Sequence, residues 1–138
     1  MNSQRDGIPQ ETSASAARRR TLSQRWLTEA EVDAKLGGSL AATLARRAGK
    51  ILGVWISDEG RYLYPDFQFG PQEPLEAMSV LLTWLPSASG SGWDQVEWLC
   101  SPHALLDKRT PAEVLLGDPR AVVTIAEREF SEDPDARW

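Results

Sequence analysis

The chain has 138 residues, of which 41% are hydrophobic, and it holds six Trp, one Cys and one His. This length and apolar content suffice for a folded core and exclude a wholly disordered chain, while one Cys excludes an intramolecular disulfide. No apolar run approaches the roughly 18 residues that span a bilayer, and no signal peptide follows Met1. We therefore expect a cytoplasmic protein of one domain or two very small ones, with no membrane association.

The net charge of −5 is distributed unevenly along the chain. Residues 1–50 hold nine Lys and Arg against five Asp and Glu, and residues 51–138 hold six against fifteen, which gives +4 and −9. A basic front half suits nucleic-acid phosphates, and an acidic back half suits a basic pocket in a protein partner. Ordinary solvated faces with a basic tail are the alternative explanation.

Residues 1–22 are polar, basic and rich in Ser and Ala, with no apolar periodicity. We interpret them as a flexible basic tail. The three consecutive arginines at 18–20 are compatible with phosphate contact but indicate no particular ligand. Regular structure is expected from residue 26 onward.

Residues 26–50 predict two short helices joined by a glycine turn. Thr28 and Glu31 match a capping box at the start of the first helix, and Gly37 is a typical stop. Ser39 is placed to cap the second helix, whose apolar residues recur at i, i+4 and i+8. These residues are Leu40, Leu44 and Ala48. Two short helices across a tight turn match a helix-turn-helix.

Residues 54–69 predict a β-hairpin with an aromatic second strand. The apolar runs at 54–56 and 62–64 flank a turn that contains Gly60, where a positive φ is easily adopted. A helix-turn-helix followed by a hairpin outlines a winged helix, which we place at residues 23–69. We interpret the aromatic residues of this hairpin as core and hinge rather than as a nucleotide-stacking platform, because acidic neighbours would repel phosphate.

Residues 70–138 predict a small helical module. An amphipathic helix is expected over residues 74–86, and a second begins at Trp93 and ends before Pro102. Thr110 and Glu113 match a second capping box. The Asp-Pro pair at 118–119 again places a capping residue before a Pro at the start of a last helix. The predicted fold is therefore mainly α, with a winged helix-turn-helix followed by this module.

Two motifs in a fixed order carry a family resemblance. The segments WLTEAEVDAKLGG and RYLYPDFQF, at 26–38 and 61–69, resemble the excisionase-like N-terminal half of antitoxins of the Xre/MbcA/ParS group. The segment WLCSPHALLDKRTPAEVLLGDPRAV, at 98–122, is similar to that group's toxin-binding domain. The residues that match the second pattern are Trp98, Leu99, Pro102, Leu105, Thr110, Pro111, Glu113 and Leu115. The resemblance covers about residues 26–130.

The resemblance implies the antitoxin of a type II toxin–antitoxin system. Such proteins bind their toxin through the C-terminal domain, and relatives are typically encoded beside a RES-domain toxin, an NAD-depleting enzyme whose active site they block. The complex commonly represses its own promoter. The implied partners are thus a RES-type toxin and operator DNA, with a homo-oligomer left open and neither cofactor nor metal expected. The alternative is a stand-alone DNA-binding transcriptional regulator without a toxin partner.

Candidate DNA contacts lie on the second helix, at its end and on the wing. They are Ser39, Thr43, Arg46, Arg47, Lys50 and Arg61. Such residues bond phosphates, and Arg reads guanine in the major groove. The helix departs from the family pattern, because Leu40, Ala41 and Ala42 stand where bulkier polar residues are usual. An ordinary solvent-exposed helix face is the alternative explanation.

Candidate toxin contacts lie on the loop and helix of residues 101–113, on the last helix and at the end of the sequence. They are His103, Asp107, Lys108, Arg109, Glu127, Arg128 and Trp138. A loop held between packed helices is a common way to present a binding surface. Each residue alone is also explained as an ordinary exposed side chain.

Cys100 and His103 lie three residues apart and are the remaining candidates for chemistry. No third orienting group, oxyanion loop or set of further metal ligands accompanies them. Cys100 follows Val96 at helical spacing, which favours a small buried hydrophobe. We therefore expect no catalytic residue and no enzyme. A small enzyme built on this pair is a weaker alternative that a Cys100→Ser variant would test.

Overall fold

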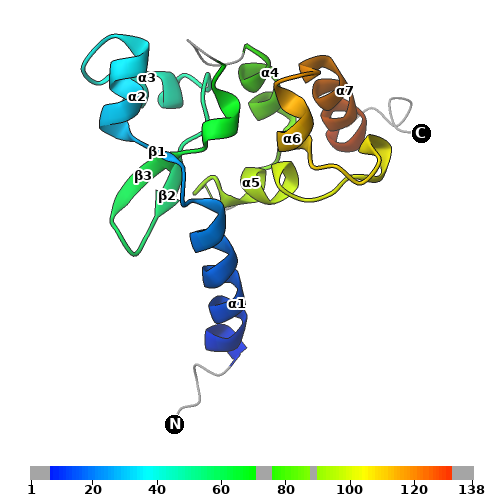
Figure 1. The fold of residues 1–138 in the computed structure, drawn as a ribbon, viewed down its shortest axis with the longest axis horizontal. Coiled ribbons are helices and arrows are strands. Elements are labelled where there is room, and N and C mark those ends of the chain that lie inside the picture. The colour runs from blue at the N-terminus through cyan, green and yellow to red at the C-terminus, as the bar shows by residue number, and fades with distance from the viewer. Residues whose placement is uncertain (1–6, 71–75, 88–89, 132–138) are drawn as a thin grey trace.

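The computed structural model describes residues 7–70, 76–87 and 90–131, with side chains described from residue 14 onward (Figure 1). It is mainly helical with a small three-stranded antiparallel sheet, which confirms the predicted fold class. The N-terminal elements are α1 (Gly7–Leu22), β1 (Leu27–Thr28), α2 (Glu29–Leu36), α3 (Ala41–Arg47), β2 (Val54–Ile56), β3 (Arg61–Tyr64) and the 3₁₀ turn η2 (Asp66–Gln68). The C-terminal elements are α4 (Ala77–Trp84), α5 (Trp93–Leu99), the 3₁₀ turn η3 (Ala104–Leu106), α6 (Pro111–Leu115) and α7 (Pro119–Phe130).

The predicted hairpin forms from β2 and β3, with Trp55 opposite Tyr62 and Gly60 at a φ of 64° in the turn. Strand β1 pairs with the other edge of β3, where Leu27 lies opposite Tyr64. The sequence gives no signal for β1, because two residues are too few to show an alternating pattern. This strand joins the start of α2 to the wing.

Helix α2 begins at the predicted capping box. The Thr28 hydroxyl accepts a hydrogen bond from the Glu31 backbone N–H at 3.2 Å, and the Glu31 carboxylate accepts one from the Thr28 N–H at 2.8 Å. Gly37, at a φ of 85°, ends the helix as predicted.

The predicted Ser39 cap of the next helix is wrong. Helix α3 begins after Leu40, which has a left-handed φ of 64°, and the Asp33 carboxylate of α2 accepts the Ala42 backbone N–H at 2.8 Å. The expected apolar stripe also faces differently, because the small Ala42 packs inward while Leu40 and Leu44 are 63% and 64% exposed.

Residues 7–22 form helix α1, whereas the sequence predicts a flexible tail. Ala and Arg favour helix, but no apolar stripe marks the segment, so its periodicity gives no signal. The last turns of α1 contact α5. Arg18 Nε lies 3.5 Å from Glu97 Oε1, and the Arg19 guanidinium lies 4.7 Å from the centre of the Trp93 ring. Figure 1 shows the rest of α1 extending away from the body of the chain.

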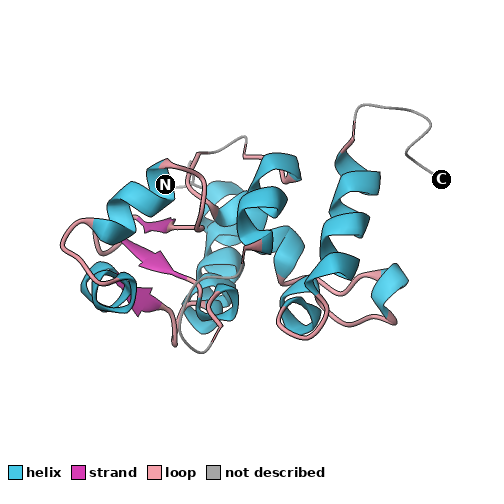
Figure 2. Cartoon of the chain, turned by 90° about the horizontal axis from the view of Figure 1, so that it is seen from above, coloured by secondary structure: helices cyan, strands magenta, loops and turns pink. Residues whose placement is uncertain are grey.

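One main core joins the two predicted parts of the chain. Trp26, Leu52, Val54 and Leu63 from the N-terminal part pack in the same buried cluster as the apolar faces of α4 to α7. These faces contribute Met78, Leu81, Leu85, Val96, Leu99, Val114, Leu115, Val122, Ile125 and Ala126. Residues before and after position 70 therefore contribute to one core. Figure 2 shows the strands gathered on one side and α7 on the other.

A smaller cluster packs α2 and α3 on the sheet, and a buried amide joins the segments that flank the hairpin. Val32, Ala42, Tyr64 and Phe69 belong to this cluster, which confirms that the aromatic run supplies core residues. The run does not continue as a strand, because the chain turns into η2 after β3. Gln68 of η2 is fully buried, and its side chain bonds the backbone of Leu52, which precedes β2, and of Pro65, which follows β3.

The C-terminal module forms with the predicted caps. The Thr110 hydroxyl accepts a hydrogen bond from the Glu113 backbone N–H at 3.1 Å. The Glu113 carboxylate accepts one from the Thr110 backbone N–H at 2.8 Å. Asp118 accepts from the Ala121 N–H at 3.2 Å, with Pro119 at the first helical position of α7. Residues 74 and 75 of the helix predicted over residues 74–86 lie outside the described residues. Among the helices of the described ranges, none has the length and apolar character to cross a membrane.

Candidate functional site

Two predicted DNA contacts, Thr43 and Arg46, are engaged within the protein. Arg46 Nε donates to the Tyr64 hydroxyl at 3.1 Å, and its guanidinium lies 3.7 Å from the centre of the Tyr62 ring. The Tyr64 hydroxyl donates to Glu29 Oε1 at 2.9 Å, and the Thr43 hydroxyl donates to Glu29 Oε2 at 2.9 Å. This network links α2, α3 and β3, so these two side chains hold the helices on the sheet.

The other candidate DNA contacts are exposed but dispersed. Ser39 precedes α3, while Arg47 and Lys50 lie at its end. On the wing, Arg61 Nε lies 2.7 Å from Glu59 Oε1, and both side chains are about half exposed. Such a surface ion pair contributes at most about 1 kcal/mol, so a phosphate can replace the carboxylate. The exposed part of α3 therefore combines basic residues with leucines.

Burial raises the pKa of Tyr64 to about 12, since it outweighs the Arg46 hydrogen bond that lowers the pKa, and the Glu29 hydrogen bond raises it further. An unfolded Tyr titrates near 10, so the stability from this shift is complete below about pH 10 and lost as pH rises through about 12. We predict that the unsubstituted chain loses ~2 kcal/mol of its free energy of unfolding across this interval. The Tyr64→Phe variant should not show this loss. Urea unfolding at a series of pH values measures it. Tyr62→Phe, a change of the only other Tyr, should retain the loss, and equal curves for both variants would contradict the prediction.

The loop between α5 and α6 carries the predicted toxin contacts on a fixed backbone. The His103 N–H donates to the Arg109 carbonyl at 3.0 Å, and the Lys108 N–H donates to the His103 carbonyl at 3.0 Å. Asp107 and Lys108 adopt left-handed φ values of 57° and 68°. These bonds close the loop on itself, so its shape is set before any partner binds.

His103 ties this loop to α7. Its Nε2 lies 3.0 Å from Glu129 Oε1, which also accepts the Trp98 indole N–H at 3.1 Å. Its Nδ1 accepts the Leu105 backbone N–H at 3.2 Å, so the hydrogen-bond pattern places the ring proton on Nε2. His103 is mostly covered, and it positions the loop rather than projecting from it.

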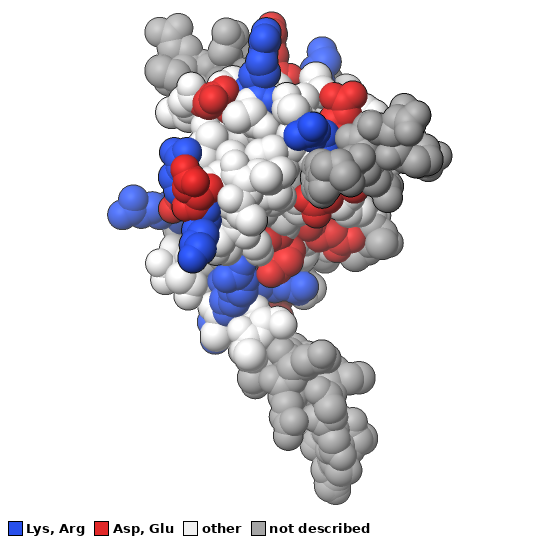
Figure 3. Space-filling view, turned by 90° about the vertical axis from the view of Figure 1, so that its right-hand side faces the viewer, with Lys and Arg blue, Asp and Glu red and all other residues white. Residues whose placement is uncertain are grey.

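The remaining predicted toxin contacts are exposed. Asp107, Lys108 and Arg109 lie on the loop, and Glu127 and Arg128 lie on α7. Trp138 lies outside the described residues. Figure 3 views this end of the molecule and shows charged side chains of both signs around an uncharged area.

Two leucines near the loop were not selected from the sequence as contacts. Leu105 is 54% exposed and Leu116 is 59% exposed. The buried centre of a protein interface is more apolar than its rim, and exposed apolar side chains supply such a centre. Only the three-dimensional structure separates them from buried leucines of the same segments.

Cys100 and His103 do not form a nucleophile–base pair. Both ring nitrogens of His103 bond elsewhere, to Glu129 and to the Leu105 backbone. Cys100 is partly buried against the main core, and this burial raises the pKa of its thiol to about 11, although Arg18 lowers it. His103 is therefore not placed to act as a base for the Cys100 thiol.

We predict that the folded chain protects Cys100 from alkylation. A rise of the thiol pKa from 9.0 to about 11 lowers the reactive thiolate fraction near neutral pH by about 100-fold. Because a more basic thiolate is also more nucleophilic, reaction with iodoacetamide should be at least ~10-fold slower in the native chain than in the urea-unfolded chain. Equal alkylation rates in the native and the unfolded chain would contradict the burial of the Cys100 thiol.

Comparison of the chain with protein-family models, with curated proteins and with solved structures gives no match. The family resemblance thus rests on the motifs of the chain itself.

Proposed function

We propose that the chain is the antitoxin of a type II toxin–antitoxin pair and neutralises a RES-type, NAD-depleting toxin in the cytoplasm. The observation that carries this proposal is the closed loop between α5 and α6. It displays the exposed Leu105 beside Asp107, Lys108 and Arg109 on a backbone fixed by hydrogen bonds. A binding element that is ordered in advance loses less conformational entropy on association. The order of the two sequence motifs further supports this function.

Neutralisation then requires only occlusion of the toxin's active site. An enzyme that consumes NAD must accommodate a diphosphate, which favours a basic entrance. Residues 51–138 carry a formal charge of −9, and opposite charges across an interface accelerate and orient association. The chain performs no chemical step in this mechanism.

Autoregulation by DNA binding forms a second part of the proposal. Arg47 and Lys50 are exposed at the end of α3. Among the described residues, Arg61 has only the exposed Glu59 as its ionic partner. Because Thr43 and Arg46 are held internally, phosphate contacts are favoured over base contacts. A stand-alone regulator would use the same residues and is the alternative function.

Co-expression tests the proposal. The product of the adjacent gene is expressed alone and together with this chain, and growth, cellular NAD and co-purification are followed. We expect growth arrest with loss of NAD, both reversed by this chain, and a complex that co-purifies. Absence of toxicity and of a complex would contradict the antitoxin function and leave the stand-alone regulator.

A further inference from the structure

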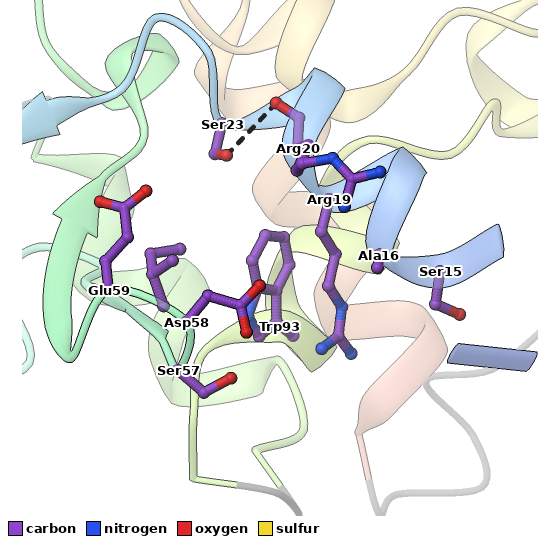
Figure 4. Close-up of a pocket in the computed structure, with 10 residues that line it drawn as sticks. Ser15, Ala16, Arg19, Arg20, Ser23, Ser57, Asp58, Glu59 and Trp93 are labelled. Carbon is purple, nitrogen blue, oxygen red and sulfur yellow. Dashed lines mark hydrogen bonds between the residues drawn. The ribbon is translucent and has the colours of Figure 1, made fainter. Parts of the chain in front are cut away.

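A cavity of about 370 Å³ lies between α1 and the turn of the β2–β3 hairpin (Figure 4). Its lining comes from three places, which are the last turns of α1, the hairpin turn and Trp93 of α5. The proposed antitoxin function does not use this cavity. Its volume lies within the range of small-molecule sites.

The aromatic part of the cavity is held rigidly by Trp93. The Trp93 indole N–H donates to the Trp55 carbonyl at 3.0 Å, so the ring cannot turn without losing this bond. The Trp26 ring packs against it, with centroids 5.5 Å apart. The Trp93 ring therefore has a fixed place in the wall of the cavity.

The α1 side of the cavity is cationic. Arg19 lies over the Trp93 ring, and Arg20 also lines the cavity. Within the part of the chain that the structure describes, neither guanidinium has an ion pair or a hydrogen bond to another side chain. The stacked Arg19 guanidinium keeps its N–H groups available, and their planar fork matches a carboxylate.

The hairpin side of the cavity is anionic. Asp58 and Glu59 line it, and Glu59 is paired with Arg61 at 2.7 Å. The Asp58 carboxylate has no ion pair among the described residues. Figure 4 shows Asp58 and Arg19 next to Trp93 from opposite walls, and they do not pair with each other.

We propose that this cavity binds a small zwitterion of the α-amino-acid class. The ligand carboxylate pairs with Arg19, and its ammonium group pairs with Asp58. An apolar side chain of the ligand packs on the part of the Trp93 ring that Arg19 and Trp26 leave exposed. A phosphate or another simple anion is repelled by the acidic turn, and a simple cation is repelled by the two arginines of α1. A neutral ligand that carries separated charges satisfies both walls at once.

The first test is calorimetric titration of the full chain with three related ligands. L-phenylalanine carries both charges, phenylethylamine lacks the carboxylate, and phenylpropanoate lacks the ammonium group. We expect L-phenylalanine to bind at least ~10-fold more tightly than either analogue, because each analogue loses one charge-assisted contact. Absence of saturable L-phenylalanine binding up to ~10 mM, or equal affinities for the three ligands, would overturn the proposal.

Two substitutions then assign the charges. Arg19→Gln should abolish the preference for L-phenylalanine over phenylethylamine and retain that over phenylpropanoate, while Asp58→Asn should do the reverse. Arg47→Gln changes an exposed Arg away from the cavity and should leave both preferences intact. Circular dichroism checks that the folds are unchanged. If neither Arg19→Gln nor Asp58→Asn alters these ligand preferences, the ligand binds elsewhere and the proposed site is wrong.

Discussion

A Gln68→Leu variant is expected to lose about 3 kcal/mol or more of the free energy of unfolding. The Gln68 carboxamide oxygen accepts the Leu52 backbone N–H at 2.7 Å, and its nitrogen donates to the carbonyls of Leu52 and Pro65 at 2.8 and 3.0 Å. Gln68 is fully buried, so leucine leaves three backbone groups without a partner and without water. Urea unfolding followed by Trp fluorescence measures the loss.

The chain supplies a matched control in Gln95, which is also buried. Within the described residues, the Gln95 Oε1 atom is buried and has no hydrogen-bond partner. Gln95→Leu therefore removes an unsatisfied oxygen and should leave the free energy of unfolding unchanged or raise it. A cost as large as that of Gln68→Leu would show that side-chain shape, rather than hydrogen bonding, determines both results.

A Leu105→Asp variant is expected to weaken the toxin complex by at least about 30-fold, or about 2 kcal/mol. Leu105 is 54% exposed on the closed loop, so aspartate places a charge at the proposed contact without entering the core. The free energy of unfolding should change by no more than ~0.5 kcal/mol, as for other surface substitutions. Surface plasmon resonance with the co-purified toxin measures the affinity.

Leu40→Asp is the control for this experiment. Leu40 is 63% exposed and lies before α3, in the part of the chain that we do not assign to the toxin. Aspartate tolerates its left-handed backbone at least as well as leucine does. Toxin affinity should remain unchanged, and a loss with Leu40→Asp but not with Leu105→Asp would place the interface on the N-terminal part.

The sequence predicts local features of this fold well. The capping boxes at Thr28 and Thr110 need only residues three positions apart, so they are visible without tertiary information. The cap of α3 by Asp33 is different, because it depends on how α2 and α3 are oriented. Helix α1 is also missed, since its contacts come from arginine side chains rather than from an apolar stripe.

The candidate surfaces are harder to predict than the fold. Arg46 and Arg47 are neighbours in sequence, yet the first bonds Tyr64 and the second is exposed. Charged residues on a short helix carry no mark that separates an internal network from a free surface. Leu105 matches the toxin-binding pattern by residue type alone, and only the closed loop shows that it is exposed.

The most direct measurement is the NAD-consuming activity of the purified adjacent gene product, titrated with this chain. We predict that the activity falls to zero at a fixed molar ratio, and that Leu105→Asp requires a large excess to reach the same inhibition. Full NAD consumption in the presence of saturating chain would contradict the antitoxin function.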